Sequence, residues 1–190
     1  QALNEANQTT LTNIYSFNKY YGLKDNINEN ESKNTELKDV MNSASNILVF
    51  ADNTEKSLRE KLSRKGYNDE LIESAVLKLK EAGLINDARL IKSYTEYLAD
   101  KKLYGKARIK LELQKKGFER ELIGQKLDEC VEDVDFNENC LKLVRKKNLV
   151  RKICDSKTAR AVTAALARYG YGYAEIKYAY TRLLEENEED

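Results

Sequence analysis

The 190-residue sequence lacks histidine, proline and tryptophan altogether. Without histidine the chain has neither the commonest general base nor the commonest metal ligand. Its three cysteines, Cys130, Cys140 and Cys154, form no CxxC pair, which indicates reduced thiols rather than a zinc or redox site. No phosphate-binding loop of the type GxxxxGK is present either. We therefore expect no enzymatic activity, no cofactor and no metal site.

Long apolar runs are also missing. The longest, residues 47–51, is far shorter than the roughly 20 residues that a membrane span needs. No signal peptide opens the chain. We expect a cytoplasmic monomer without a membrane partner.

Charge is abundant but balanced, because 33 basic residues nearly cancel 32 acidic ones. Nucleic-acid binding would therefore need local patches rather than a polycationic chain. Residues 53–131 carry 18 basic and 14 acidic side chains, and residues 132–182 carry 11 and 6. Residues 1–52 and the last eight residues are net acidic. Two basic regions thus lie between two acidic ends.

From about residue 37 onward, apolar residues recur with the spacing of helices, and no stretch alternates with period two. This pattern predicts an all-α fold. Asparagine and aspartate at Asn68, Asn86 and Asp155 are predicted helix N-caps. Glycine tolerates the left-handed backbone of a helix C-cap, and the pattern is interrupted at Gly66, Gly83, Gly105, Gly117 and Gly170.

One pattern occurs three times, in residues 58–72, 109–123 and 162–176. In each copy a glycine precedes an aromatic residue, a leucine lies four positions before the glycine, and an isoleucine lies six positions after it. A further helix fits before each pair, at roughly 37–51, 87–101 and 135–148. Since units this short cannot bury an apolar face alone, we expect tandem three-helix repeats that stack into an elongated, curved array.

This pattern divides the chain into four parts. Residues 1–38 form an N-terminal extension, poorly ordered or separately folded, whose residues 22–36 have too little apolar content to pack and are predicted to be a polar linker. The three predicted repeats are residues 39–84, 85–132 and 133–190, the last with an acidic tail.

Three segments of the chain resemble the RecX family, bacterial regulators of the RecA recombinase. They are Ser57–Gly66, Leu84–Asp87 and Tyr104–Phe118. The last is the most specific, because it begins with a Tyr-Gly pair and ends with Lys-Gly followed by an aromatic residue. The resemblance covers about residues 39–186. The sequence departs from the family pattern at Asp52–Thr54, at Asn86 where a second aspartate is usual, and at Leu90 where an aromatic is common.

The resemblance implies a non-enzymatic modulator, mainly an inhibitor, that acts in homologous recombination, DNA repair and the SOS response. Such proteins bind in the groove of the RecA filament on single-stranded DNA. They limit its extension, ATPase, strand exchange and coprotease activity. The family also has the three-fold, three-helix layout.

Basic side chains gather in two dense runs, residues 101–116 and 142–160. Such runs attract phosphates or acidic protein surfaces, with strong salt dependence in both cases. Alternatively, they are solvated faces that keep the helices soluble. We predict a surface for the RecA filament and for single-stranded DNA, with double-stranded DNA as a second candidate, made of Arg59, Arg64, Lys65, Lys101, Lys102, Lys106, Arg108, Lys110, Lys115, Lys116, Arg145, Lys146, Lys147, Arg151, Lys152, Lys157, Arg160 and Arg168.

Five tyrosines near the end of the chain could stack on single-stranded bases. The helical spacing of Tyr173, Ile176 and Tyr180 instead favours packing of at least two of the tyrosines in the core. The tyrosines are Tyr169, Tyr171, Tyr173, Tyr178 and Tyr180.

Two other functions stay open. One is a sequence-independent DNA-binding helix-turn-helix protein without a recombinase partner. Its base-reading residues would lie on the helix after each glycine–aromatic turn, yet those helices carry few Arg or Lys. The other is a scaffold for a different protein.

Overall fold

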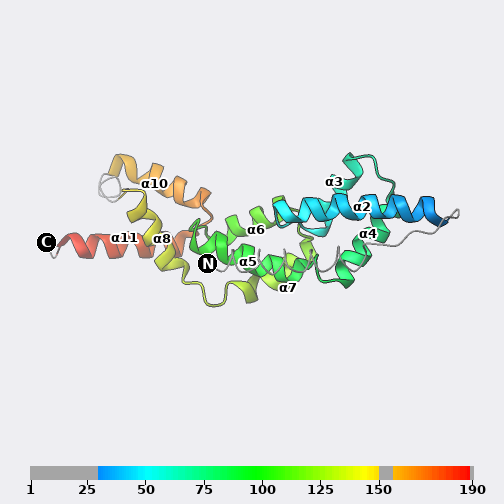
Figure 1. Cartoon of the computed structure of the whole chain (residues 1–190). Coiled ribbons are helices and arrows are strands. Elements are labelled where there is room, and N and C mark those ends of the chain that lie inside the picture. Colours follow the sequence, from blue (N-terminus) through cyan, green and yellow to red (C-terminus); the bar gives the residue numbers. More distant parts are fainter. Residues whose placement is uncertain (1–29, 150–155, 189–190) are drawn as a thin grey trace. The chain divides into compact units, whose positions relative to one another are not determined.

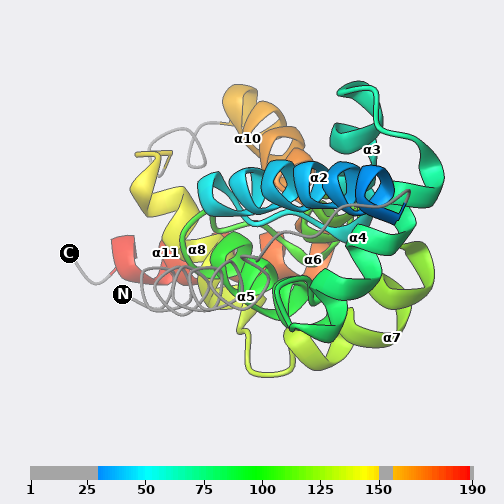
Figure 2. The same cartoon turned by 45° about the vertical axis from the view of Figure 1, so that its right-hand side comes forward.

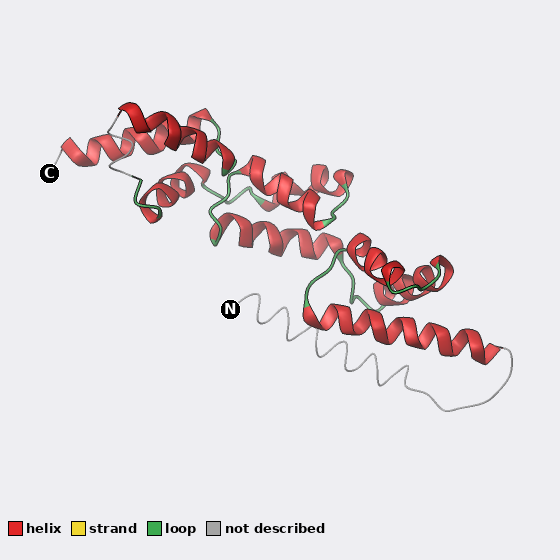
Figure 3. Cartoon of the chain, turned by 90° about the horizontal axis from the view of Figure 1, so that it is seen from above, coloured by secondary structure: helices red, strands yellow, loops and turns green. Residues whose placement is uncertain are grey.

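The computed structural model describes the backbone of residues 30–149 and 156–188 and the side chains of residues 35–149 and 158–186. Within these ranges every regular element is an α-helix, which confirms the all-α prediction (Figure 3). No helix there is both long and apolar enough to cross a membrane. The helices are α2 (Asn30–Phe50), α3 (Glu55–Arg64), α4 (Asp69–Glu81), α5 (Asp87–Asp100), α6 (Lys106–Lys116), α7 (Arg120–Cys130), α8 (Phe136–Lys146), α10 (Ser156–Arg168) and α11 (Tyr173–Glu188).

Helix α2 begins earlier than the sequence suggested. Residues 30–36 were expected in a polar linker, but they form the first turns of this helix. Val40, Met41 and Ala44 are buried further along it. Extending an existing helix costs less free energy than nucleating a new one. A helix that is stabilised by this buried face can therefore extend through the polar residues before it. The rest of the predicted N-terminal extension lies outside the described residues.

Side-chain caps fix several helix starts. Asn68 accepts a hydrogen bond from the Leu71 amide (2.8 Å) and Asn86 accepts one from the Arg89 amide (2.9 Å), so both predicted caps are confirmed. Thr54 caps α3 through the Ser57 amide (3.1 Å). Each cap of this kind stabilises a helix by about 1 kcal/mol. The predicted cap Asp155 is outside the described residues.

Four of the five predicted glycine breaks have positive φ: Gly66, Gly83, Gly117 and Gly170. Gly105 also lies in a break, between α5 and α6, but the left-handed conformation there belongs to Leu103 (φ 52°), and Gly105 directly precedes α6. Position 105 requires glycine because the backbone at Gly170 leaves no room for a side chain. A Cβ atom on Gly105 would lie 2.3 Å from the Gly170 carbonyl oxygen.

The chain divides into two compact units. Unit 1 contains the described residues up to Leu90 together with Lys116–Phe118. Its helices α2, α3 and α4 pack against one another (Figure 1, Figure 2). Their shared core is formed by Val40, Met41, Ala44, Leu48, Leu58, Leu62, Ile72, Ala75, Val76, Leu79, Leu84 and Ile85.

Unit 2 contains Ile91–Lys115 and the described residues from Glu119 onward. Its most extensive helix pairing joins α8 to α11. Ile109 and Leu113 of α6 are fully buried, as their spacing predicted. One core cluster of this unit is formed by Leu103, Cys140, Leu141, Leu143, Val144, Val162, Leu166, Tyr171, Ile176, Ala179 and Leu183.

We predict that Gly105→Ala lowers the free energy of unfolding by about 2 kcal/mol, because its Cβ atom would overpack the contact with Gly170. Gly124 is the matched control. It lies within α7, and a Cβ atom built on it has nothing within 4 Å. Because alanine favours a helix interior more than glycine does, Gly124→Ala should raise the free energy of unfolding by roughly 0.5–1 kcal/mol. Urea unfolding followed by circular dichroism measures both changes. Unchanged stability in Gly105→Ala would contradict the close approach.

Cys130 and Cys140 are free thiols, and Cys154 lies outside the described residues. Burial raises the pKa of Cys140 to about 12. Because the thiolate is the reactive form, we predict that iodoacetamide modifies Cys140 about a thousandfold more slowly in the folded chain than in urea. Mass spectrometry of the peptide that contains Cys140 follows the reaction. Equal rates in both states would show that the thiol is exposed.

Candidate basic interface

Three of the predicted cations of unit 1 are engaged within the fold. Arg59 binds Glu55 (2.8 Å) and Glu73 (2.6 Å), and its hydrogen bond to Glu73 raises the pKa of Arg59. Lys65 Nζ donates to Ser43 Oγ at 2.8 Å. Lys116 Nζ donates to a backbone carbonyl, that of Asp52, at 2.8 Å. Each of these three cations therefore already has a partner within unit 1.

Lys116 and Arg64 of unit 1 differ in their access to solvent. Burial lowers the pKa of Lys116, as expected for an ammonium group removed from water. Arg64 lies 3.6 Å from Glu60 with 73% of its side chain exposed, so it is accessible.

Four predicted cations of unit 2 form exposed or partly exposed ion pairs: Lys106–Asp128 (3.0 Å), Arg108–Glu112 (2.8 Å), Lys115–Glu112 (3.2 Å) and Arg145–Glu186 (2.5 Å). Exposed pairs of this kind contribute about 0–1 kcal/mol each. A phosphate or a partner carboxylate could therefore replace the internal acid at little cost.

Another group of predicted cations in unit 2 is exposed and forms no ion pair with the described residues. Lys102 stands apart, because its ammonium group lies 5.5 Å from the centre of the Tyr97 ring. Arg151, Lys152 and the side chain of Lys157 lie outside the described residues. Lys147 also has no ion pair and contacts the Tyr169 ring instead. The remaining exposed cations without an ion pair are Lys101, Lys110, Lys146, Arg160 and Arg168.

Two tyrosines join the two basic runs of the sequence. The Arg108 guanidinium lies 5.5 Å from the Tyr104 ring centre, and the Lys147 ammonium group lies 5.3 Å from the Tyr169 ring centre. Tyr104 and Tyr169 themselves meet edge-to-face at 5.7 Å. We call these four side chains the basic row. The order of cation, ring, ring and cation combines charge with aromatic surface.

The basic row was not predicted as a unit, although each cation in it was. The signal in the sequence is that both tyrosines directly precede a glycine, at Gly105 and Gly170. Those two glycines are in contact, and the Gly105 amide donates to the Tyr169 carbonyl at 2.8 Å. This backbone contact is what places one ring against the other.

An open cavity of about 460 Å³ lies near one end of this region. Lys106 and Lys110 of α6 line it, together with Gly172 and Glu175 around the start of α11. In the part of the chain that the structure describes, no cluster of acidic or cysteine side chains is arranged to hold a metal ion. Asp128, which pairs with Lys106, also lines the cavity, so its charged lining consists of two lysines and two carboxylates.

The tyrosines at the end of the chain differ in their surroundings. Tyr171 is buried and donates to the Leu103 carbonyl at 2.9 Å, while Tyr178 donates to Glu138 at 2.7 Å. Tyr171 is buried and Tyr169, Tyr178 and Tyr180 pack against the core cluster of unit 2, so the prediction that at least two of the tyrosines pack in the core is confirmed. Tyr173, the first residue of α11, is 80% exposed. Among these tyrosines, Tyr173 therefore has the ring most accessible for stacking.

Models of two domains match the chain: "RecX, first three-helix domain" over residues 41–79 and "RecX, second three-helix domain" over residues 86–127. The regulatory protein RecX of Clostridioides difficile (strain 630) is 34% identical over 183 residues, which cover 93% of this chain and 84% of that protein. The regulatory protein RecX of Pseudomonas entomophila (strain L48) is 32% identical over 132 residues, or 70% of this chain and 83% of that protein.

Solved structures have the same fold. The crystal structure of RecX from Lactobacillus salivarius matches 78% of this chain and 97% of that chain, with a TM-score of 0.66 and 24% identity. A second crystal structure of regulatory protein RecX matches 86% of this chain and 83% of that chain, with the same TM-score and 19% identity. The resemblance inferred from the sequence is thus confirmed, and the chain belongs to the RecX family of regulatory, non-enzymatic proteins.

Proposed function

We propose that the chain binds the RecA filament on single-stranded DNA through the basic surface of unit 2 and thereby limits filament growth, ATPase activity and strand exchange. The observation that carries this proposal is that unit 2 holds both the basic row and a set of exposed cations without ion pairs among the described residues. Membership of the RecX family supplies the partner. The proposal implies a monomer that acts in the cytoplasm, where the filament forms.

The electrostatics of the basic row suit a partner that offers both anions and flat apolar groups. Arg108 has a buried Nε–H without a hydrogen-bond partner in the described residues. An unsatisfied buried donor costs about 1–3 kcal/mol, so an incoming acceptor would recover part of that free energy. Phosphate oxygens and the carboxylates of an acidic protein surface are both suitable acceptors.

Direct reading of duplex DNA has less support. The helices that follow the glycine–aromatic turns are α4, α7 and α11, and their cations are largely engaged. Lys80 binds Glu55 (2.8 Å), Lys126 binds Glu129 (2.8 Å) and Arg182 lies 3.4 Å from Glu185. The predicted cations without an ion pair instead lie on α6 and α10 and near the ends of α5 and α8, a placement that favours contact with a phosphate backbone or an acidic protein surface.

The first test titrates the chain into a RecA ATPase assay on single-stranded DNA. We expect inhibition well below one regulator per RecA subunit, at a salt concentration that abolishes binding to bare DNA. The physical reason is that bare-DNA binding depends on counterion release and fades with salt, whereas a filament adds protein contacts. Inhibition only where the chain sequesters bare DNA would leave the helix-turn-helix DNA-binding alternative in its place.

The second test reverses charges that have no internal partner. We predict that the triple variant Lys110→Glu, Lys146→Glu and Arg168→Glu weakens filament binding by at least roughly tenfold, equivalent to about 1.4 kcal/mol. These substitutions break no ion pair of the described residues, unlike reversal of Lys106 or Arg108. Fluorescence anisotropy with labelled filaments measures the affinity.

The matched control changes the net charge by the same amount elsewhere. Lys56, Arg89 and Arg120 are exposed, form no ion pair in the described part of the chain and lie outside the predicted surface. Reversal of all three to Glu should reduce affinity much less than the test variant. Equal loss in both variants would mean that net charge alone matters and would remove the basic surface from the proposal.

A further inference from the structure

Four tyrosines of unit 2 form two pairs of neighbouring rings. Tyr94 and Tyr97 lie one turn apart on α5, and their rings stack with centres 6.2 Å apart and planes 18° from parallel. The other pair is Tyr104 and Tyr169 of the basic row. All four residues are only partly buried, unlike Tyr171 in the core, so they lie at the surface of unit 2. We call these four rings the tyrosine set.

The connector after α5 brings the two pairs together. Leu103 takes the left-handed conformation, and the Tyr104 amide donates to the Leu98 carbonyl at 3.0 Å. The chain therefore turns back along the end of α5 before α6 begins. Burial is the main cause of the raised pKa of Tyr94, and Tyr104 adds to it, as expected for two side chains that lie close together. The four rings thus belong to one surface.

Three of these rings carry a cation. The charged group lies 5.3–5.5 Å from the ring centre in the pairs Lys102–Tyr97, Arg108–Tyr104 and Lys147–Tyr169. Lys102 and Lys147 are exposed and form no ion pair with the described residues. A cation on an exposed ring contributes only about two- to fivefold to an equilibrium constant. The contact is therefore weak enough to be exchanged for a stronger one.

We propose that the tyrosine set stacks on bases of single-stranded DNA, while Lys102, Arg108 and Lys147 bind the phosphates beside those bases. Aromatic rings combined with a positively charged surface bind single strands without reading their sequence, because every base has a flat face. This inference rests on the proposed function. It deepens that function by assigning this part of the surface to the DNA strand of the filament rather than to the RecA protein.

The free energies favour an exchange of cation for base. Stacking of one base on an aromatic side chain contributes about five- to a hundredfold to affinity, which exceeds the contribution of a cation on the same ring. A base can therefore displace a lysine ammonium group, which then binds a phosphate through its flexible side chain. Arg108 has a further reason to bind a phosphate, because its buried Nε–H has no acceptor among the described residues.

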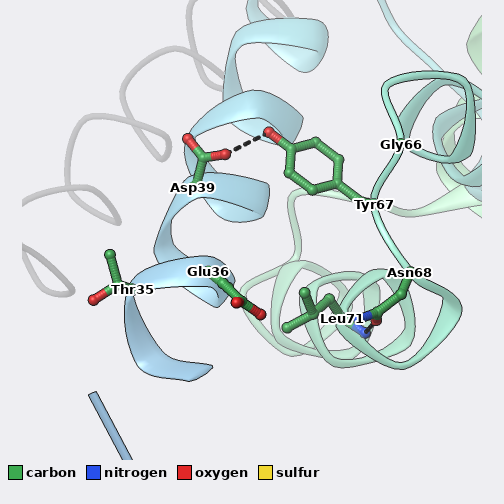
Figure 4. A pocket seen from close by; sticks show the side chains of 7 residues that line it. All are labelled: Thr35, Glu36, Asp39, Gly66, Tyr67, Asn68 and Leu71. Atoms are coloured by element: carbon green, nitrogen blue, oxygen red, sulfur yellow. Dashed lines mark hydrogen bonds between the residues drawn. The ribbon is translucent and has the colours of Figure 1, made fainter. Parts of the chain in front are cut away.

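A partly buried tyrosine alone is not such a site, as unit 1 illustrates (Figure 4). Tyr67 lines a cavity of about 360 Å³ there, and its hydroxyl donates to Asp39 at 2.8 Å. Glu36 is the other charged side chain among the described residues that line this cavity. Two carboxylates repel phosphates. The cations beside the rings therefore distinguish the tyrosine set.

Neither a duplex nor an acidic protein surface uses both features of the tyrosine set. The bases of a duplex stack on one another and present only their edges in the grooves. Carboxylates of a protein would bind the cations but leave the rings without a flat partner. A single strand offers phosphates together with unstacked bases.

Binding of a fluorescein-labelled oligothymidine at low salt, measured by fluorescence anisotropy, tests this inference. We expect Tyr104→Leu combined with Tyr169→Leu to weaken binding by at least roughly tenfold, because leucine keeps the apolar bulk but offers no ring for stacking. The slope of log affinity against log salt should stay unchanged, since no phosphate contact is lost. Lys102→Gln combined with Lys147→Gln should instead reduce the magnitude of this slope by about 0.7 for each lysine.

Two further double variants separate stacking from a loss of structure. Tyr104→Phe combined with Tyr169→Phe keeps both rings and should bind like the parent chain. Tyr67→Leu combined with Tyr173→Leu removes two rings that carry no cation in the described part of the chain, and it should also leave binding unchanged.

Unchanged affinity in the Tyr104→Leu and Tyr169→Leu variant, or an equal loss in the Tyr67→Leu and Tyr173→Leu control, would overturn stacking. A parent chain that does not bind the oligonucleotide at low salt would overturn it as well. Loss of RecA ATPase inhibition with unchanged oligonucleotide affinity would show that the rings contact RecA, so that the stacking fails while the proposed function stands. Absence of ATPase inhibition by the parent chain would contradict the proposed function itself.

Discussion

The contact between Gly105 and Gly170 is the constraint on which unit 2 depends. Two backbones approach so closely that neither position has room for a Cβ atom. The Gly105 amide is satisfied there by the Tyr169 carbonyl rather than by water. This contact brings Tyr104 against Tyr169 and, through their rings, Arg108 of α6 and Lys147 beyond α8 into one row. The candidate interface is thus a product of repeat packing.

Most of the fold could be predicted from the sequence, because helix periodicity, N-caps and glycine turns are local signals. Asn68 and Asn86 cap the helices expected of them, and Gly66 marks a turn. The role of Gly105 could not be predicted, since a sequence shows that a position is glycine but not whether glycine provides a positive φ or space. The start of α2 was also missed, because its polar first turns depend on packing that begins several residues later.

The candidate site was predictable in composition but not in detail. The sequence identified the dense basic runs, and the spacing of Arg108 and Glu112 could have indicated an ion pair one turn apart. The Lys106–Asp128 pair and the bond from Lys116 to the Asp52 carbonyl join residues far apart in the sequence, so only the tertiary structure reveals them. The same holds for the row that links Tyr104 to Tyr169.

The helix dipole separates the cations that the fold explains from those that it does not. Lys146 and Arg168 are the last residues of α8 and α10, where the partial negative charge of a helix C-terminus favours a cation by about 0.3–1 kcal/mol. Their placement therefore has a structural reason even without a partner. Lys110 lies near the middle of α6 and Arg160 lies inside the first half of α10, and neither has an ion pair among the described residues. These two cations gain nothing from a helix end. Their charge therefore serves solubility or a partner, and Lys110 and Arg160 are the positions at which charge reversal tests a partner with the least effect on the fold.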